Sequence, residues 1–493
     1  MKTSKILTLC FALVATCSTA FSAMAYVPYD SYIYSTSTGR ITAEYSPVPY
    51  VPARTIDRAS LGVPLVQPIG MCFDKDMNLY ITDAGTNALV IVDKDYQVVK
   101  RIEDFENNGL LDFFGGPEGV FVADNGDIYI CDTNQKRIIV LDKTYQFKQE
   151  IKDVVPANAD EYFVFLPSKI AVDASGNLFV ISKNEYSGIL QLDPNGKFLS
   201  FIGSNKVVFD PITKLWKKIM SKEQREQMEQ FLPVEYTNLQ MDNDGFFYTV
   251  SKSEDSTDPI KRLNPSGKDV LIKNGYVGVA GDVRTADMEE KDFKPSAFVD
   301  VCPGENGLIY ALDVTKGRIF VYNNEGFLFY AFGGLGQQLG TFVTPSAIEV
   351  RGSDVLVADQ TTGRITVFKR TAYGNLIDTA DYCYSVGEYE TSVETWREVV
   401  KLNSNFELAY AQIGKVYLRQ KRNEEAMQYF MLGNYRGDKI TGTSGYNKAF
   451  FEYRRQIATA FFGPVVVTAV VFIVAGTAYK RYRKRRRAYE RKS

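Results

Sequence analysis

Short apolar segments recur along the middle of the chain at intervals of about 50 residues, from about residue 68 to 370. In each block an apolar strand leads through a turn into a second apolar strand, and a third strand often follows. A single four-stranded sheet cannot cover both of its own faces, so repeats of this length are typical of propeller blades. The pattern predicts a mainly β fold, a six-bladed β-propeller over residues 61–371. The six blocks begin at Pro68, Pro117, Pro167, Tyr236, Pro295 and Pro345.

Two segments depart from the regular blocks. The sixth block lacks an outer strand after Phe368, and residues 54–57, within an N-terminal segment 26–60, stand where such a strand is needed. We therefore expect 54–57 to close the ring. A helical pattern interrupts the ring before the fourth block, within an insertion at 205–232. This insertion is either a helical hairpin packed on the rim or a lid or partner-docking element beside the central opening.

The apolar period changes from 2 to 3.6 at about residue 373, which indicates helices over 373–456. Two repeats, 373–406 and 407–440, precede a capping helix at 447–456. The second repeat resembles a tetratricopeptide repeat, which implies either a helical spacer or a concave peptide-binding surface. The residues that carry this resemblance are Tyr410, Ile413, Gly414, Tyr417, Ala426 and Phe430.

Both ends of the chain carry targeting patterns. Residues 1–25 have a charged start, a short apolar stretch and a small-residue cleavage pattern, which predict a secretory signal peptide. Residues 457–479 contain no charge and are long enough to cross a bilayer. The basic tail 480–493 follows at once, and the positive-inside rule places such a flank in the cytoplasm. We therefore expect a single-pass protein of the cell membrane, with its N-terminal ectodomain outside.

Charge and composition exclude several kinds of chemistry. The chain has no histidine, so Ser-His-Asp and Cys-His catalysis, HExxH zinc sites and imidazole acid–base chemistry are ruled out. The net charge is −2, although the last 14 residues hold nine Lys or Arg and one Glu. An acidic body with a basic tail indicates a membrane protein and no nucleic-acid partner.

The remaining candidate chemistry is sparse. The four cysteines beyond the signal peptide, Cys72, Cys131, Cys302 and Cys383, form no CxxC motif, and we expect buried free thiols. The segment 74–78, Asp-Lys-Asp-Met-Asn, begins like a calcium loop but lacks the glycine and the distal glutamate. A hairpin turn explains it better.

The blocks resemble the NHL-repeat family of six-bladed propellers, within the TolB-like and gluconolactonase-like superfamily. Strand segments such as 79–83, Leu-Tyr-Ile-Thr-Asp, carry this resemblance, which covers roughly 300 residues. Ser182 and Ser251 replace the Asp that should end the second strand in the third and fourth blocks. The family implies binding of proteins, nucleic acids or polymers, while some related propellers are lactonases or lyases.

Residues just after each block start are expected to enter the central opening. A lactonase-type propeller gathers carboxylates and an Asn there around a metal ion. Glu118 and Asn238 are available, but no second central carboxylate is evident. Glu118 is the candidate catalytic residue, unless it only pairs with Lys169 across neighbouring blades. The expected residues at the opening are Glu118, Ser168, Lys169, Thr237, Asn238, Ser296 and Ser346.

Binding is favoured over catalysis because no complete acid–base pair is assignable. The sequence predicts an extracytoplasmic binding or scaffold protein whose ligand or partner is a protein or a carbohydrate. Its architecture resembles proteins encoded beside sugar transporters, which implies an accessory role in carbohydrate uptake and association with a transporter complex. The alternative is a gluconolactonase-type hydrolase with a divalent metal such as calcium at Glu118. No cofactor is expected otherwise.

Overall fold

The computed structural model describes residues 27–37, 39–156, 163–203, 235–242, 244–252, 258–286, 288–434 and 445–490. It has two compact units. The first contains the chain up to Tyr34 together with Thr42–Asn375, and the second contains Ser35–Ile41 and the chain from Leu376 onward. The predicted signal peptide and the predicted helical insertion lie outside the described residues.

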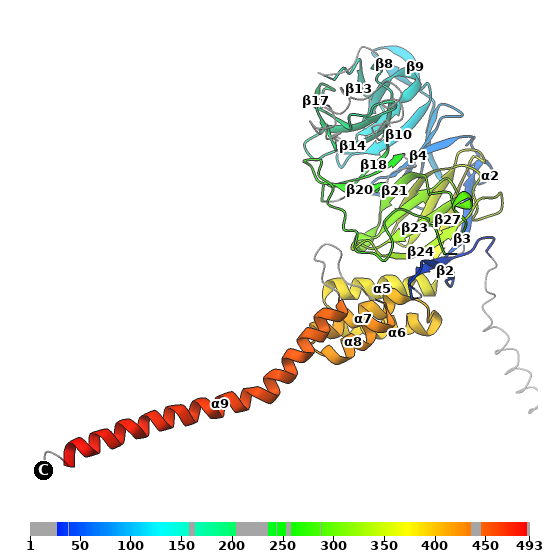
Figure 1. The fold of residues 1–493 in the computed structure, drawn as a ribbon. Helices are drawn as coiled ribbons and strands as arrows, with labels where there is room; N and C mark the ends of the chain where they lie inside the picture. Colours follow the sequence, from blue (N-terminus) through cyan, green and yellow to red (C-terminus); the bar gives the residue numbers. More distant parts are fainter. Residues whose placement is uncertain are drawn as a thin grey trace, which may run out of the picture. The chain divides into compact units, whose positions relative to one another are not determined.

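The first unit is a six-bladed β-propeller, as the repeats predict (Figure 1). Blades one to three are antiparallel sheets of four strands in chain order. Between blades one and two stands a separate hairpin of β8 (Asp104–Asn107) and β9 (Leu110–Phe113). The strands of these blades are β4 (Pro68–Phe73), β5 (Leu79–Asp83), β6 (Ala88–Val92) and β7 (Val98–Ile102); β10 (Pro117–Val122), β11 (Ile128–Asp132), β12 (Arg137–Leu141) and β13 (Phe147–Lys152); and β14 (Pro167–Val172), β15 (Leu178–Ser182), β16 (Ile189–Leu192) and β17 (Phe198–Ile202).

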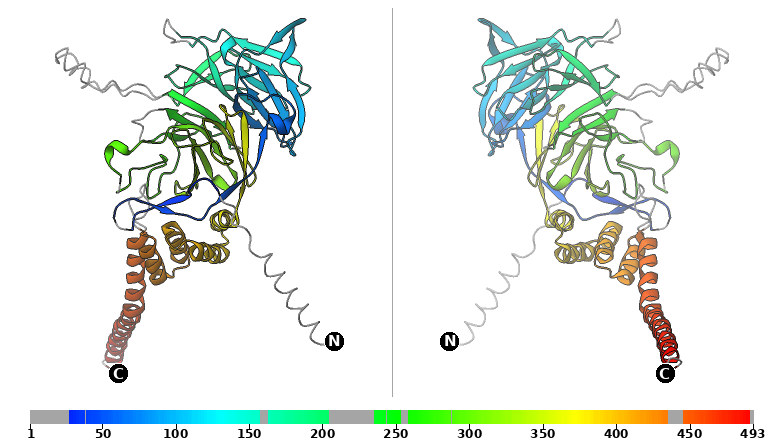
Figure 2. Two further views of the ribbon diagram at one scale, coloured as in Figure 1. Left: turned by 90° about the vertical axis from the view of Figure 1, so that its right-hand side faces the viewer. Right: turned by 90° about the vertical axis from the view of Figure 1, so that its left-hand side faces the viewer.

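Blades four to six are less regular in their strand make-up. Figure 2 draws the ribbon from two further sides. The described part of blade four has three strands, whereas blade five gains two N-terminal strands at its outer edge. The innermost strands β4, β10, β14, β18, β21 and β25 contact one another in turn, and β25 returns to β4. The strands of these blades are β18 (Glu235–Met241), β19 (Phe247–Lys252) and β20 (Ile260–Leu263); β21 (Phe298–Pro303), β22 (Ile309–Asp313), β23 (Arg318–Tyr322) and β24 (Leu328–Gly333) with β1 (Tyr32–Ser35) and β2 (Thr42–Tyr45); and β25 (Pro345–Arg351), β26 (Asp354–Asp359), β27 (Arg364–Arg370) and β3 (Tyr50–Asp57).

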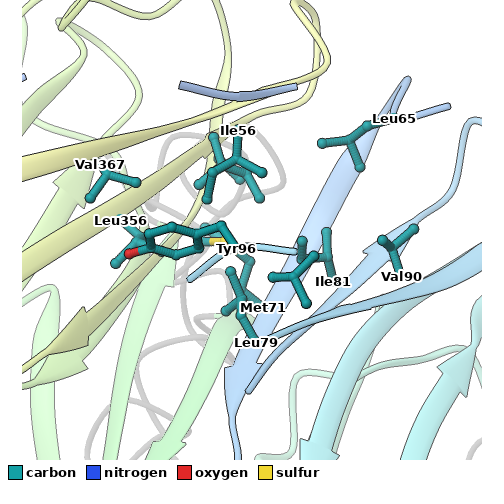
Figure 3. Close-up of a cluster of buried hydrophobic side chains, with 13 residues drawn as sticks. Ile56, Leu65, Met71, Leu79, Ile81, Val90, Tyr96, Leu356 and Val367 are labelled. Atoms are coloured by element: carbon teal, nitrogen blue, oxygen red, sulfur yellow. The ribbon is translucent and has the colours of Figure 1, made fainter. Parts of the chain in front are cut away.

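The ring closes through β3, which is the outer strand of blade six. It pairs antiparallel with β27, with Ile56 opposite Ile365 and Asp57 opposite Arg364. This confirms the strand expected at 54–57. The Ile56 side chain is fully buried in the core between blades six and one, where Figure 3 shows it near Leu356 and Val367. A strand from the N-terminal side of the propeller therefore completes its last blade.

The aspartate that ends the second strand of four blades braces its own blade. Each of these carboxylates is fully buried and accepts hydrogen bonds from backbone N–H groups just before the innermost strand. In blade three, Ser182 replaces the aspartate and its Oγ accepts from Leu166 N at 2.9 Å. In blade four, the Ser251 Oγ donates to Pro259 O instead. The four aspartates are Asp83, Asp132, Asp313 and Asp359.

Asp359→Ala is expected to cost about 3 kcal/mol of unfolding free energy. The carboxylate accepts from four partly buried backbone N–H groups, of Val343, Thr344, Thr361 and Thr362, and alanine leaves these donors without it. Ser182→Ala removes a single acceptor and should cost about 1 kcal/mol. Urea unfolding of the full chain in detergent measures both, and equal costs for the two variants would contradict the bracing role.

The turns that join the strands use local side-chain acceptors. Asp74 Oδ1 accepts from the backbone N–H groups of Asp76 and Asn78, and Asn78 Nδ2 donates to Asp74 Oδ2. Asp173 holds its own turn in the same way. The 74–78 segment is therefore the hairpin turn that the sequence favoured over a calcium loop.

The second unit is helical. Its helices follow the two predicted helical repeats, and the tetratricopeptide resemblance itself stays a prediction. Gly414 lies against the ring of Phe430, where an added Cβ would come within 2.7 Å of the ring. Glu407 accepts hydrogen bonds from Ser35 Oγ and Thr36 N, which holds the segment Ser35–Ile41 in this unit. The helices are α5 (Ala372–Val386), whose first residues belong to the propeller unit, α6 (Tyr389–Leu402), α7 (Glu407–Arg419) and α8 (Asn423–Leu432).

The last helix, α9 (Gly445–Glu490), is one continuous element. The capping helix expected at 447–456 and the membrane span expected at 457–479 both lie within this one helix. The two segments have no turn chemistry between them, and Pro464 lies within the helix without ending it. By length and composition α9 is able to cross a membrane, and its most apolar stretch is not buried.

Candidate functional site

A cavity of about 420 Å³ occupies the middle of the ring. The innermost strands of all six blades line it, together with turns that follow them. In each of these strands the pairing register shifts near the start, which is a β-bulge; the shift follows the first paired residue in five strands and the second in β18. Positions are counted here from the last paired residue before the bulge, which is Tyr236 in β18 and the first strand residue elsewhere. Residues at the third and fifth positions then face the cavity. These are Gly70, Gly119, Lys169, Asn238 and Asp300 at the third position, and Cys72, Phe121, Gln240, Cys302 and Glu349 at the fifth.

The structure brings two of the seven expected residues to the cavity, Lys169 and Asn238. The other five do not line it. Four of them occupy the second position, whose side chain the bulge directs away from the cavity. Three of these four side chains form hydrogen bonds outside the cavity. Ser168 Oγ donates to Ile181 O, and Ser346 Oγ donates to Pro68 O. The five residues are Glu118, Ser168, Thr237, Ser296 and Ser346.

Blade five begins later than the sequence pattern indicates. Its innermost strand starts at Phe298 rather than at Pro295, so Asp300 holds the third position. Ser296 lies before this strand, and its Oγ accepts from Asp282 N. Two carboxyl groups that were not evident in the sequence therefore reach the centre. Asp300 and Glu349 both line the cavity.

Asp300 is 2% exposed and is held by backbone donors. Its Oδ1 accepts from Val301 N at 2.9 Å and its Oδ2 accepts from Ile348 N at 2.8 Å, in the neighbouring blade. Burial raises the pKa of this carboxyl to about 6, while the positive charge of Lys169 acts in the opposite direction. The group therefore titrates close to neutral pH.

Glu349 is 7% exposed and has its pKa raised to about 8, chiefly by burial. Its Oε1 accepts from Gln240 Nε2 at 2.6 Å, a bond that crosses the ring interior between blades four and six. The thiol of Cys302 lies 3.8 Å from its Oε2. The nearby charge of Asp300 also raises the pKa of Glu349. At neutral pH this side chain is therefore a protonated acid, able to donate as well as accept.

Lys169 brings a positive charge to the same cavity. Its charge lowers the pKa of both Asp300 and Glu349, so the three groups share one electrostatic environment. Among the described residues, however, Lys169 forms no ion pair within 4.0 Å. Blade three, which carries Lys169, stands opposite blade six, which carries Glu349, in a ring of six blades.

Glu118 has a different role from the one that the sequence suggested. Its Oε1 accepts from Lys183 Nζ at 2.6 Å, so its partner is Lys183 rather than Lys169. No group of three Cys, Asp or Glu residues in the described part of the chain is arranged to hold a metal ion. The residues around Glu118 therefore do not fit the divalent metal that the hydrolase alternative requires.

Lactone hydrolysis by the full chain in detergent, with calcium or zinc added, is expected to stay at background. The Glu118 carboxylate is paired with Lys183, so it supplies no metal ligand set. Wild type and Glu118→Gln should give the same rate. Metal-dependent turnover that Glu118→Gln abolishes would restore the hydrolase alternative.

The four cysteines are free thiols, as expected. Cys72 and Cys302 line the cavity, Cys131 is fully buried in β11, and Cys383 lies in α5. Burial raises the pKa of Cys72 to about 12 and raises that of Cys131 further. These thiols therefore remain protonated and are poor nucleophiles.

No model of a known protein family matches the chain, and no curated relative matches it. Solved structures match the propeller. A virginiamycin B lyase from Staphylococcus aureus matches 64% of this chain and 98% of its own, at 12% identity and a TM-score of 0.39. A streptogramin B lyase matches 66% and 98%, at 15% identity and a TM-score of 0.38. A protein described as the extracellular domain of a one-component system from B. thetaiotaomicron matches 62% and 34%, at 12% identity and a TM-score of 0.36. Likenesses at this level carry no argument about the ligand or chemistry of this chain.

Proposed function

We propose that the chain is a membrane-anchored extracytoplasmic binding protein whose propeller holds a small polar ligand in its central cavity. The observation that carries this proposal is the cavity itself, into which polar side chains from four blades converge. Ligand sites are concave and combine apolar walls with a few placed polar groups. Lys169, Asn238, Gln240, Asp300 and Glu349 are such groups.

The wall of the cavity is divided into two parts. Blades three to six supply most of the polar groups, whereas blades one and two supply mainly glycine and apolar residues, among them Phe73 and Phe121. Asp74 of blade one also lines the cavity, but its carboxylate is bound within its own turn. The glycines are required by the close approach of neighbouring strands. A Cβ at Gly70 would lie 2.1 Å from Glu118 O, and one at Gly119 would lie 2.5 Å from Ser168 O. A carbohydrate suits such a wall, because a sugar ring presents C–H groups on one face and hydroxyl groups at its edge. An accessory role beside a sugar transporter belongs to the same proposal.

A thermal-shift screen of the full chain in detergent tests the cavity as a binding site. The probes are neutral mono- and disaccharides, and the variants are Lys169→Gln and Lys183→Gln. Lys183 belongs to the same blade but pairs with Glu118 and does not line the cavity, which makes it the matched control. A saccharide that stabilises wild type and Lys183→Gln, but stabilises Lys169→Gln less, supports the proposal. An equal shift in both variants would place the saccharide outside the cavity.

The membrane anchor in this proposal is α9. Its apolar stretch is exposed along its length and is followed by basic residues from Lys480 to Arg487. A chain with the propeller outside the cell should lose it to protease added to intact cells. The basic end of α9 should be cut only after permeabilisation. A propeller that is fully protected in intact cells would contradict this orientation.

A further inference from the structure

The central cavity holds opposite charges apart. The ammonium group of Lys169 enters from blade three, and the carboxyl groups of Asp300 and Glu349 enter from blades five and six. The two groups of an ion pair in a protein interior normally lie within hydrogen-bond distance of each other, because an uncompensated buried charge is costly. In the described part of the chain, no carboxylate lies within 4.0 Å of the Lys169 ammonium. The other charged residues of the lining are either bound to the protein, as Asp74, Asp242 and Arg351 are, or exposed, as Glu305 is. Because the raised pKa of Glu349 keeps that side chain protonated at neutral pH, the cavity keeps the Lys169 ammonium apart from the Asp300 carboxylate.

The two carboxyl groups are fixed and do not move freely toward Lys169. Backbone N–H groups of Val301 and Ile348 hold both oxygens of Asp300. Gln240 holds Glu349 through a bond of 2.6 Å. These bonds fix the two carboxyl groups in place on blades five and six. The gap to Lys169 is thus a built feature of the ring.

Blade four supplies amide groups beside these carboxyl groups. Asn238 Nδ2 donates to Val301 O at 3.1 Å, and Gln240 Nε2 donates to Glu349. Each amide therefore donates one N–H to another group of the protein. Each also has a carbonyl oxygen, which is a hydrogen-bond acceptor. Carboxyl and amide carbonyl oxygens together suit a ligand group that carries several N–H donors. An ammonium group has three such donors.

We infer that the central cavity binds a small zwitterion, with its carboxylate on Lys169 and its ammonium group at Asp300 and Glu349. This inference rests on the proposed function and names the charges of the ligand. A free amino acid meets the description, and so does a sugar that bears both groups. The ligand neutralises both the Lys169 ammonium and the Asp300 carboxylate, which neither a simple cation nor a simple anion does.

Isothermal titration of the full chain in detergent tests this inference with ω-amino acids of increasing length. The probes are glycine, β-alanine, γ-aminobutyrate, δ-aminovalerate and ε-aminocaproate, and the matched single-charge compounds are butylamine and butyrate. One length is expected to bind at least about tenfold more tightly than either single-charge compound. Lys169→Gln should weaken that binding at least about tenfold, while Lys183→Gln leaves it unchanged.

The outcomes separate the inference from the function on which it rests. If saccharides bind in a Lys169-dependent manner and no amino acid does, the cavity is a binding site and the zwitterion inference is wrong. If neither class binds, both are wrong. Equal affinity of Lys169→Gln and wild type for the best amino acid would also overturn the inference. Circular dichroism checks that each variant is folded, and Asp300→Asn gives an independent loss at the carboxyl groups.

Discussion

Ile56→Asp is expected to lower the free energy of unfolding by about 3–5 kcal/mol, because it places an unpaired carboxylate in a fully buried position. Ile56 lies in β3, the strand that completes blade six, and packs against residues of blade one. The change therefore weakens the point at which the first and last blades meet. Urea unfolding of the full chain in detergent measures the loss as a lower midpoint.

Ala53→Asp is the matched control for this prediction. Ala53 lies in the same strand but is exposed, so its replacement should cost less than about 0.5 kcal/mol. A similar loss for both variants would show that any charge in β3 disturbs the chain. No loss for Ile56→Asp would mean that β3 does not contribute to the stability of the ring.

Glu349→Gln is expected to flatten the pH dependence of stability between pH 5 and 9. In the unfolded chain this carboxyl has its ordinary pKa of 4.5, whereas burial raises its pKa to about 8 in the folded chain. The folded state therefore holds the proton more tightly. The stabilisation from this group is complete below about pH 4.5 and is lost as the pH rises through about 8. At about 1.4 kcal/mol per pKa unit, the wild type should lose a few kcal/mol that the variant retains.

Urea midpoints at several pH values measure this difference. The variant keeps an acceptor for Gln240, since a glutamine side chain has a carbonyl oxygen. Glu305→Gln, an exposed carboxylate that also lines the cavity, should leave the wild-type pH dependence unchanged. Parallel curves for wild type and Glu349→Gln would show that Glu349 is ionised in the folded chain over the whole range.

The blade pattern of the fold could be predicted because its determinants are local. Apolar strands, turn residues and buried aspartates repeat at a regular interval, so each block indicates the same sheet. The outer strand at 54–57 could be predicted because blade six otherwise lacks its last strand. The two serines that replace aspartate also have a local explanation. Ser182 still accepts a backbone hydrogen bond, from Leu166 N, with a shorter side chain.

The candidate site could be predicted only in part, because a bulge in each innermost strand decides which side chains face the cavity. Counting directly from the block starts places Glu118 at the centre, whereas the bulge directs the next residue, Gly119, to the cavity. In blade five the block start is also displaced from the strand, since Pro295 precedes the first strand residue by three positions. Asp300 and Glu349 are visible in the sequence, but their meeting depends on strand register and on the closure of the ring.

Native mass spectrometry of the full chain released from micelles tests the central claim most directly. The chain is incubated with the best-binding saccharide or amino acid, and the variant is Lys169→Gln combined with Glu349→Gln. We expect one bound ligand per wild-type chain and per Lys183→Gln chain, and none on the double variant. A ligand retained by the double variant, or no bound ligand on the wild type with any compound of the two series, would contradict binding in the central cavity.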